Sequence, residues 1–248
     1  NEMGDALPAV DLGTGVIALD VSVGAEHACA LLEGGLVKCW GDNTHGPLGL
    51  GDEQSRGATP GDMGDNLPAV DLGAGAKAVS LSAGFQHTCA LLDTGQIKCW
   101  GRSLSGVLGL GSKESWGDEP NEMGDALPAV DLGAGATASA LSTGTETACA
   151  LLDAGKLKCW GSNFPGSLGL GDTKNRGDDP GEMGDNLPWL DLGNGAAPVS
   201  VSAGGSHICA VTSGGKVKCW GSSQSGQLGL GDSDTRGDEP LEMGDNLP

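Results

Sequence analysis

Eight cysteines are the side chains in this sequence whose type and spacing most restrict its chemistry. They form four pairs whose members are ten positions apart: Cys29 and Cys39, Cys89 and Cys99, Cys149 and Cys159, and Cys209 and Cys219. A glycine-containing turn lies midway in each pair, which predicts a β-hairpin with the two cysteines opposite each other. We therefore expect four disulfides and an oxidising compartment. Buried free thiols and zinc ligands are the alternatives, although zinc sites use shorter C-x₂₋₄-C spacings.

Carboxylates offer a second kind of chemistry. The stretch GDTKNRGDDPGEMGDNLP contains five acidic residues within fourteen positions: Asp172, Asp178, Asp179, Glu182 and Asp185. Calcium takes six to eight oxygen ligands, so these residues form a candidate calcium site. Their spacing matches neither an EF-hand nor a nonapeptide calcium repeat, and a solvated acidic edge is the alternative. We predict no other cofactor.

The histidines give weaker evidence for a functional site, and the common catalytic motifs are absent from the sequence. His27, His87 and His207 each lie two residues before the first cysteine of a pair, where the remaining pair has Thr147. A ring of histidines could bind a metal, but a histidine bonded to backbone is the simpler expectation. There is no G-x-S-x-G elbow, H-E-x-x-H, P-loop or strand-linked G-x-G-x-x-G motif, so we predict that the chain is not an enzyme.

The cysteine pairs recur because the whole chain is a tandem repeat of 60 residues. The units are residues 1–60, 61–120, 121–180 and 181–240, and residues 241–248 begin a fifth unit or supply a closing strand. In the second unit, alternating residues predict strands at 77–84, 87–93 and 96–101, followed by a short strand or loop at 106–111. The predicted fold class is all-β, with propeller-type blades of antiparallel strands in a closed ring or an open array.

One stretch resembles a known repeat. GSHICAVTSGGKVKCWGSSQSGQLGLGD, residues 205–232, is similar to the repeat of the regulator-of-chromosome-condensation family. The shared pattern is G-x-x-H-x-C-A-L, a turn, C-W-G and G-Q-L-G-x-G, and all four units carry most of it. The resemblance implies a β-propeller with four-stranded blades, usually seven of them, and secreted bacterial members are the nearer likeness. Some members activate small GTPases or bind chromatin, but no loop motif for those activities matches here.

Tryptophan occurs at two kinds of position. Trp40, Trp100, Trp160 and Trp220 each follow the second cysteine of a pair, so strand alternation directs them to the face opposite the cysteine. We expect them to pack between blades, with a ligand-stacking platform as the alternative. Trp116 stands where other units have arginine, and Trp189 where they have alanine. Both are candidate partner contacts, with incidental surface variation as the alternative.

The net charge limits the classes of partner that the chain can bind. With 33 acidic against 13 basic residues the formal charge is −20, which excludes binding to a nucleic-acid backbone. No apolar run of 18 residues is present, so no membrane span is expected. We predict a non-enzymatic extracellular or cell-surface scaffold, secreted and self-associating into a fibre or surface structure. The alternatives are a protein- or glycan-binding adhesion module and an exchange-factor-like regulator.

Overall fold

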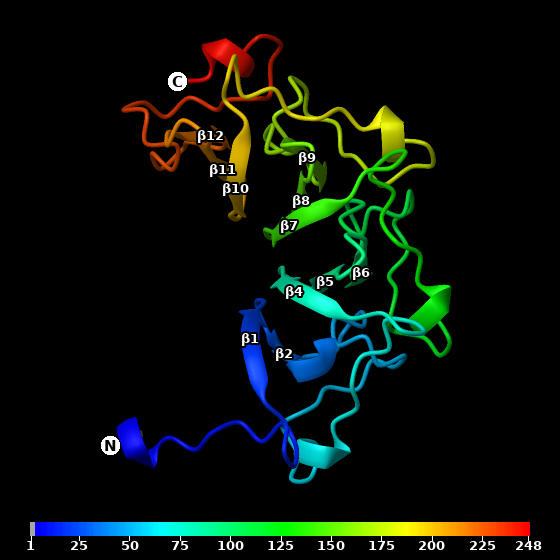
Figure 1. The fold of residues 1–248 in the computed structure, drawn as a ribbon. Coiled ribbons are helices and arrows are strands. Elements are labelled where there is room, and N and C mark those ends of the chain that lie inside the picture. Colours follow the sequence, from blue (N-terminus) through cyan, green and yellow to red (C-terminus); the bar gives the residue numbers. More distant parts are fainter. Residues whose placement is uncertain (1–2) are drawn as a thin grey trace.

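The chain folds into four three-stranded antiparallel sheets that follow one another along an open arc (Figure 1). The structure is a computed structural model and describes residues 3–248. Each repeat supplies one sheet, with its strands hydrogen-bonded in chain order. The strands are β1 (Ala18–Val23), β2 (His27–Leu32) and β3 (Val37–Gly41); β4 (Ala78–Ala83), β5 (His87–Leu92) and β6 (Ile97–Gly101); β7 (Ala138–Thr143), β8 (Thr147–Leu152) and β9 (Lys156–Gly161); and β10 (Pro198–Ala203), β11 (His207–Thr212) and β12 (Val217–Gly221).

Loops and short turns make up the rest of each repeat. Residues 3–248 contain no α-helix, only 3-10 turns of three residues: η1 (Gly4–Ala6), η2 (Glu33–Gly35), η3 (Gly64–Asn66), η4 (Gly124–Ala126), η5 (Gly184–Asn186) and η6 (Gly244–Asn246). The stretch at 106–111 is a loop, and an isolated bridge between Gly101 and Trp116 marks the place of a fourth strand. The prediction of an all-β blade repeat is confirmed.

The central hairpin of each sheet has the register that the cysteine spacing predicted. Cys89 and Cys99 lie directly opposite each other in β5 and β6, with their Cα atoms 4.1 Å apart, and their sulfurs are bonded. Gly95 closes this turn at φ +78°, a conformation that glycine adopts without strain. The other three pairs are bonded in the same way, and the described residues hold no free cysteine.

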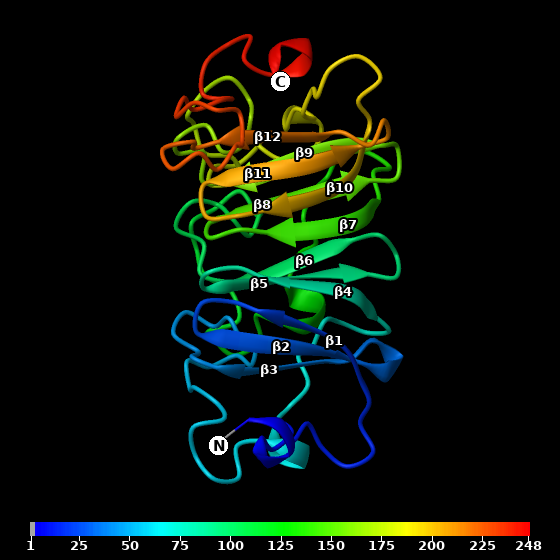
Figure 2. The same ribbon diagram turned by 90° about the vertical axis from the view of Figure 1, so that its left-hand side faces the viewer.

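The hydrophobic core lies between neighbouring sheets rather than within one thick layer. Three apolar clusters occupy the three junctions. At the junction of the second and third sheets, Cys89 and Cys99 pack with Trp160, so cysteines face the following sheet and tryptophans face the preceding one. Figure 2 shows the stacked sheets from the side on which their first strands lie. Alanine and leucine fill most of the remaining volume, which suits closely spaced thin layers.

The first and last sheets lie at opposite ends of the arc (Figure 1). The opening segment of a repeat, here called its lead-in (residues 62–73, 122–133 and 182–193 in the second to fourth repeats), contacts the repeat before it, and residues 241–248 contact the fourth repeat in the same way. The Gly244 amide donates to the Asp191 carbonyl at 3.0 Å, and the Asp245 carboxylate accepts the Asn194 amide at 2.7 Å. This segment therefore continues the array from the fourth repeat instead of lying beside the first.

Candidate functional site

The most regular polar contacts lie at the junctions between sheets. At each one, a tryptophan indole nitrogen donates a hydrogen bond to a carbonyl of the preceding repeat, 53 positions earlier: Trp100 to Pro47 at 2.9 Å, Trp160 to Val107 at 2.8 Å, and Trp220 to Ser167 at 3.0 Å. These three indoles are fully buried. Each supplies both apolar area and a directional bond, which together fix how one sheet sits on the next.

One lysine in each repeat, buried in the second and third repeats and half-buried in the first and fourth, bonds the following lead-in to the sheet. The Lys98 ammonium donates to the carbonyls of Leu72 and Gly124, at 2.9 and 2.8 Å. Lys38 and Lys158 make the corresponding pairs of bonds, and Lys218 bonds Gly244 and Leu247. Sequence reasoning missed this role because lysine is usually exposed. The available signal was a lysine before the second cysteine of every pair.

Two histidines are buried between sheets, and burial lowers their pKa values. The His27 pKa falls to about 4, although the Asp42 charge opposes the shift. The His87 pKa falls to about 3, with the nearby His27 as a second cause. The Thr88 hydroxyl donates to the Pro47 carbonyl at 3.0 Å, so it accepts its 2.9 Å bond from His27 Nε2. Both rings are therefore neutral near pH 7.

The hydrogen bond between His27 and Thr88 has no equivalent at the next junction, where His87 and Thr147 lie. The counterpart of Thr88 in the third repeat is Ala148, so this position offers no hydroxyl to His87. His87 Nε2 consequently has no hydrogen-bond partner among the described residues, and neither does the Thr147 hydroxyl that replaces a histidine. The three histidines lie in the first, second and fourth sheets, and within residues 3–248 they belong to no group of side chains that could hold a metal ion.

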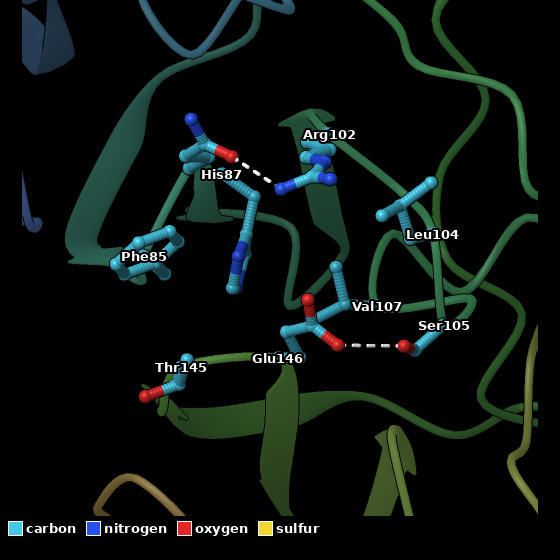
Figure 3. A pocket seen from close by; sticks show the side chains of 9 residues that line it. Phe85, His87, Arg102, Leu104, Ser105, Val107, Thr145 and Glu146 are labelled. Atoms are coloured by element: carbon cyan, nitrogen blue, oxygen red, sulfur yellow. Dashed lines mark hydrogen bonds between the residues drawn. The ribbon is translucent and has the colours of Figure 1, made fainter.

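A shallow pocket opens beside His87 (Figure 3). Phe85, Leu104 and Val107 supply its apolar lining. On its polar side, Arg102 donates to the Gln86 side chain at 2.7 Å, and the Ser105 hydroxyl donates to Glu146 at 2.7 Å (Figure 3). Its enclosed volume of about 10 Å³ holds no more than one water molecule. The pocket is therefore a gap between the second and third sheets.

The predicted calcium residues are engaged one by one in holding loops. Asp172 binds the Arg176 guanidinium at 2.7 Å, and Asp178 pairs with Lys113 at 3.2 Å. One Glu182 oxygen accepts three backbone amides, those of Gly177, Asp178 and Asp179, and Asp185 accepts the Ala134 amide. Within residues 3–248 no three such side chains are arranged to hold a metal ion. The structure does not bring the five carboxylates together.

The two off-pattern tryptophans lie in different surroundings. Trp116 is half-buried and packs against the cores of two junctions. Trp189 is 52% exposed, and the Lys156 ammonium lies 5.0 Å from the centre of its ring. Trp189 lines both a groove of about 840 Å³ and a smaller hollow of about 400 Å³. It is thus the tryptophan of this pair that presents a free surface.

The end faces of the arc expose residues that are buried at every internal junction. On the last sheet Val217 is 62% exposed, whereas its counterpart Ile97 is fully buried. On the first sheet Val21 is 58% exposed, whereas its counterpart Leu81 is 7% exposed. Trp40, the first of the four regular tryptophans, is only half-buried and makes no hydrogen bond through its indole to any described residue. The first and last sheets thus show apolar side chains that internal junctions bury.

The comparisons with known proteins agree with this repeat geometry. A family model described as "Regulator of chromosome condensation (RCC1) repeat" matches residues 19–46, 78–106 and 199–227, and a second model of that description matches residues 35–91. The matched segments cover the hairpin with its paired cysteines in three repeats. The chain is an RCC1-type repeat protein. No helix that the structure describes could cross a membrane.

Relatives of this RCC1-type chain include much longer proteins. It is 33% identical over 221 residues to the ultraviolet-B receptor UVR8 of Arabidopsis thaliana, which covers 88% of this chain and 44% of the receptor. It is 30% identical over 237 residues to the human probable E3 ubiquitin-protein ligase HERC6, covering 92% of this chain and 20% of the ligase. This chain thus spans less than half the length of either relative.

Solved structures show the same fold at low identity. Prp20p from Saccharomyces cerevisiae superposes with a TM-score of 0.68 at 20% identity, covering 93% of this chain and 51% of Prp20p. Human WBSCR16 gives a TM-score of 0.66 at 19% identity, covering 89% of this chain and 50% of that one. The four sheets therefore correspond to about half of each of these folds.

Proposed function

We propose that this chain is a non-enzymatic structural scaffold that joins further copies of itself, head to tail, through its two end faces. The observation that carries this proposal is a set of half-made junction contacts. The Trp40 indole on the first sheet is a donor without an acceptor. In the loop after β12, the Gln227 carbonyl holds the acceptor position that Pro47, Val107 and Ser167 hold inside the array.

A second recurring bond is divided between the ends in the same way. Inside the array, the Gly111 amide donates to the Gly177 carbonyl at 3.0 Å, and the two other junctions repeat this contact. The equivalent donor in the fourth repeat is the Gly231 amide, and the equivalent acceptor in the first repeat is the Gly57 carbonyl. The exposed Val21 and Val217 lie on these same two faces. Donor, acceptor and apolar surface are therefore complementary.

The form of the assembly follows from the two faces being different surfaces. Such a contact either closes into a ring or propagates as a filament. The curvature of the arc, and its match to about half of Prp20p, favour closure by two copies. A fibre or surface structure is the form expected if the junction does not close. The four disulfides support an extracellular or cell-surface setting.

Glycine at position 226 allows a test that leaves the free chain intact. A methyl group added at Gly106 would collide with the Asp178 backbone of the next repeat, and Gly46 and Gly166 are equally crowded. A methyl group at Gly226 meets nothing within 4 Å. Gly226→Ala should therefore obstruct an incoming sheet while leaving the existing four in place.

Gly195→Ala is the matched control. Its φ of +72° is close to the +77° of Gly226, so both variants carry a similar backbone strain of about 1 kcal/mol. Neither Gly195 nor any of its counterparts in the other repeats has an atom within 4 Å of an added methyl group. We expect light scattering and sedimentation to show a dimer or larger species for wild type and Gly195→Ala, and a monomer for Gly226→Ala. A wild type that stays monomeric in high salt, where its charge is screened, would refute the proposal.

Binding of another protein or a glycan is a second candidate function, because Trp189 presents an exposed aromatic surface beside a hollow.

A further inference from the structure

The same hollow occurs at two places in the array, formed where a loop of one repeat meets the lead-in of a later one. One copy is lined by the loop at residues 49–51 and by Ala69, Asn121 and Met123, among others. The other is lined by the residues 120 positions further on, together with Glu239 and Gly244. Each has a volume of about 400 Å³. The hollow itself is thus a product of the repeat, and differences between the two copies are differences of lining.

Two substitutions distinguish the second hollow. Trp189 stands in place of Ala69, and Leu241 in place of Asn121. Both are exposed, Trp189 by 52% and Leu241 by 84%, so neither is needed for the core. Leu241 also has a φ of +73°, a conformation that asparagine tolerates better than leucine. The fold alone therefore gives no reason for two large apolar side chains here.

The lining of this hollow suits a positive charge. Asp191 and Glu239 contribute carboxylates, and no lysine or arginine lines it. Asp238 and Glu242 add further negative charge nearby, and the pKa of Asp238 is raised by burial and by the Glu242 and Glu239 charges. Lys156, the cation that lies over Trp189, lines the adjacent larger groove instead.

We propose that the hollow between Trp189 and Leu241 binds an arginine or lysine side chain on a flexible segment of another protein. The indole attracts a cation to its face. Glu239 is placed to pair with the charged group, while Leu241 and Met243 cover the methylene stem. This site needs only one copy of the chain and does not depend on the end faces.

Binding of a labelled peptide tests this directly. The probe is a Gly-Ser peptide with four arginines and two leucines, and its affinity is followed by fluorescence anisotropy at chain concentrations below any self-association. Trp189→Ala and Leu241→Asn introduce residues that other repeats carry at these positions, so folding is retained. Loss of the cation–π contact in Trp189→Ala should weaken binding about 3- to 30-fold. Glu239→Gln should weaken it and reduce its dependence on salt.

Two further variants separate a specific site from a generally acidic surface. Trp116→Arg replaces the other off-pattern tryptophan by the residue of three other repeats and should leave affinity unchanged or slightly lower. Ala69→Trp with Asn121→Leu rebuilds the lining in the first hollow and should raise the stoichiometry from one peptide to two.

Two results would overturn the proposal. In one, Trp189→Ala binds the peptide as wild type does, which would mean that bulk charge alone attracts it. In the other, a neutral trisaccharide of N-acetylglucosamine binds at Trp189 while the peptide does not, which would assign the hollow to a glycan.

Discussion

Removing one disulfide at a time should reveal how much the packing at each junction adds to the stability of its hairpin. All four disulfides close loops with a sequence separation of 10. The chain-entropy relation gives about 2.7 kcal/mol for a loop of roughly ten residues at 25 °C. This contribution is equal for every hairpin, so any difference between hairpins must come from packing.

The two hairpins to compare are β5–β6 and β11–β12. Cys89 and Cys99 are fully buried against the next sheet, whereas Cys209 and Cys219 are partly exposed on the end face. Each buried sulfur removed should cost about 1 kcal/mol of packing. The double alanine variant at Cys89 and Cys99 should therefore lose about 5 kcal/mol of local stability, and the variant at Cys209 and Cys219 about 3 kcal/mol.

Hydrogen exchange of the amides in each hairpin, with urea unfolding alongside, measures these losses. Local exchange is the suitable assay because repeat arrays can open one unit at a time. Equal losses in the two variants would refute the packing difference. A loss below about 1 kcal/mol in both would refute the estimate of the loop constraint.

Three other substitutions test the polar groups that lie between repeats. Acid should destabilise the chain through His87 and His27, because the unfolded state takes up protons below about pH 6.5 while the folded state does so only near pH 3 and pH 4. His87→Thr, which copies the third repeat, should lower the slope of unfolding free energy between pH 6 and pH 4 by about 1.4 kcal/mol per pH unit; identical slopes would contradict this. Lys98→Met should cost about 3 kcal/mol in chemical denaturation by deleting two charged hydrogen bonds. Lys38→Met, at a half-buried position, should cost less, and a reversed order would contradict the assigned role.

Short-range sequence patterns predicted the hairpins well, because their geometry is decided locally. A glycine at the turn and a sequence separation of ten between the cysteines were enough to place Cys89 opposite Cys99. The lysine contacts could not be predicted in this way, since the Lys98 acceptors Leu72 and Gly124 lie 26 positions away on either side. A contact across that sequence separation can be inferred only when the path of the lead-in is known.

The acidic stretch shows how little a count of carboxylates says about their arrangement. Counting carboxylates suggested calcium, yet Glu182 binds the amides of its own loop and Asp172 binds Arg176. Glycine-rich loops leave many amides without a secondary-structure partner, and these carboxylates satisfy them. The sequence-based interpretation therefore left out the backbone amides of the loops, which need hydrogen-bond acceptors.

The bonds from Lys38, Lys98 and Lys158 to the following lead-in also set the order in which the sheets are completed during synthesis. Lys38 bonds the Gly64 carbonyl, so the first sheet cannot be fully tied until the opening residues of the second repeat have left the ribosome. The same delay recurs at each repeat, because Lys98 waits for Gly124 and Lys158 for Gly184. A growing chain would thus fold as a moving front, about half a repeat behind the residue that is leaving the ribosome.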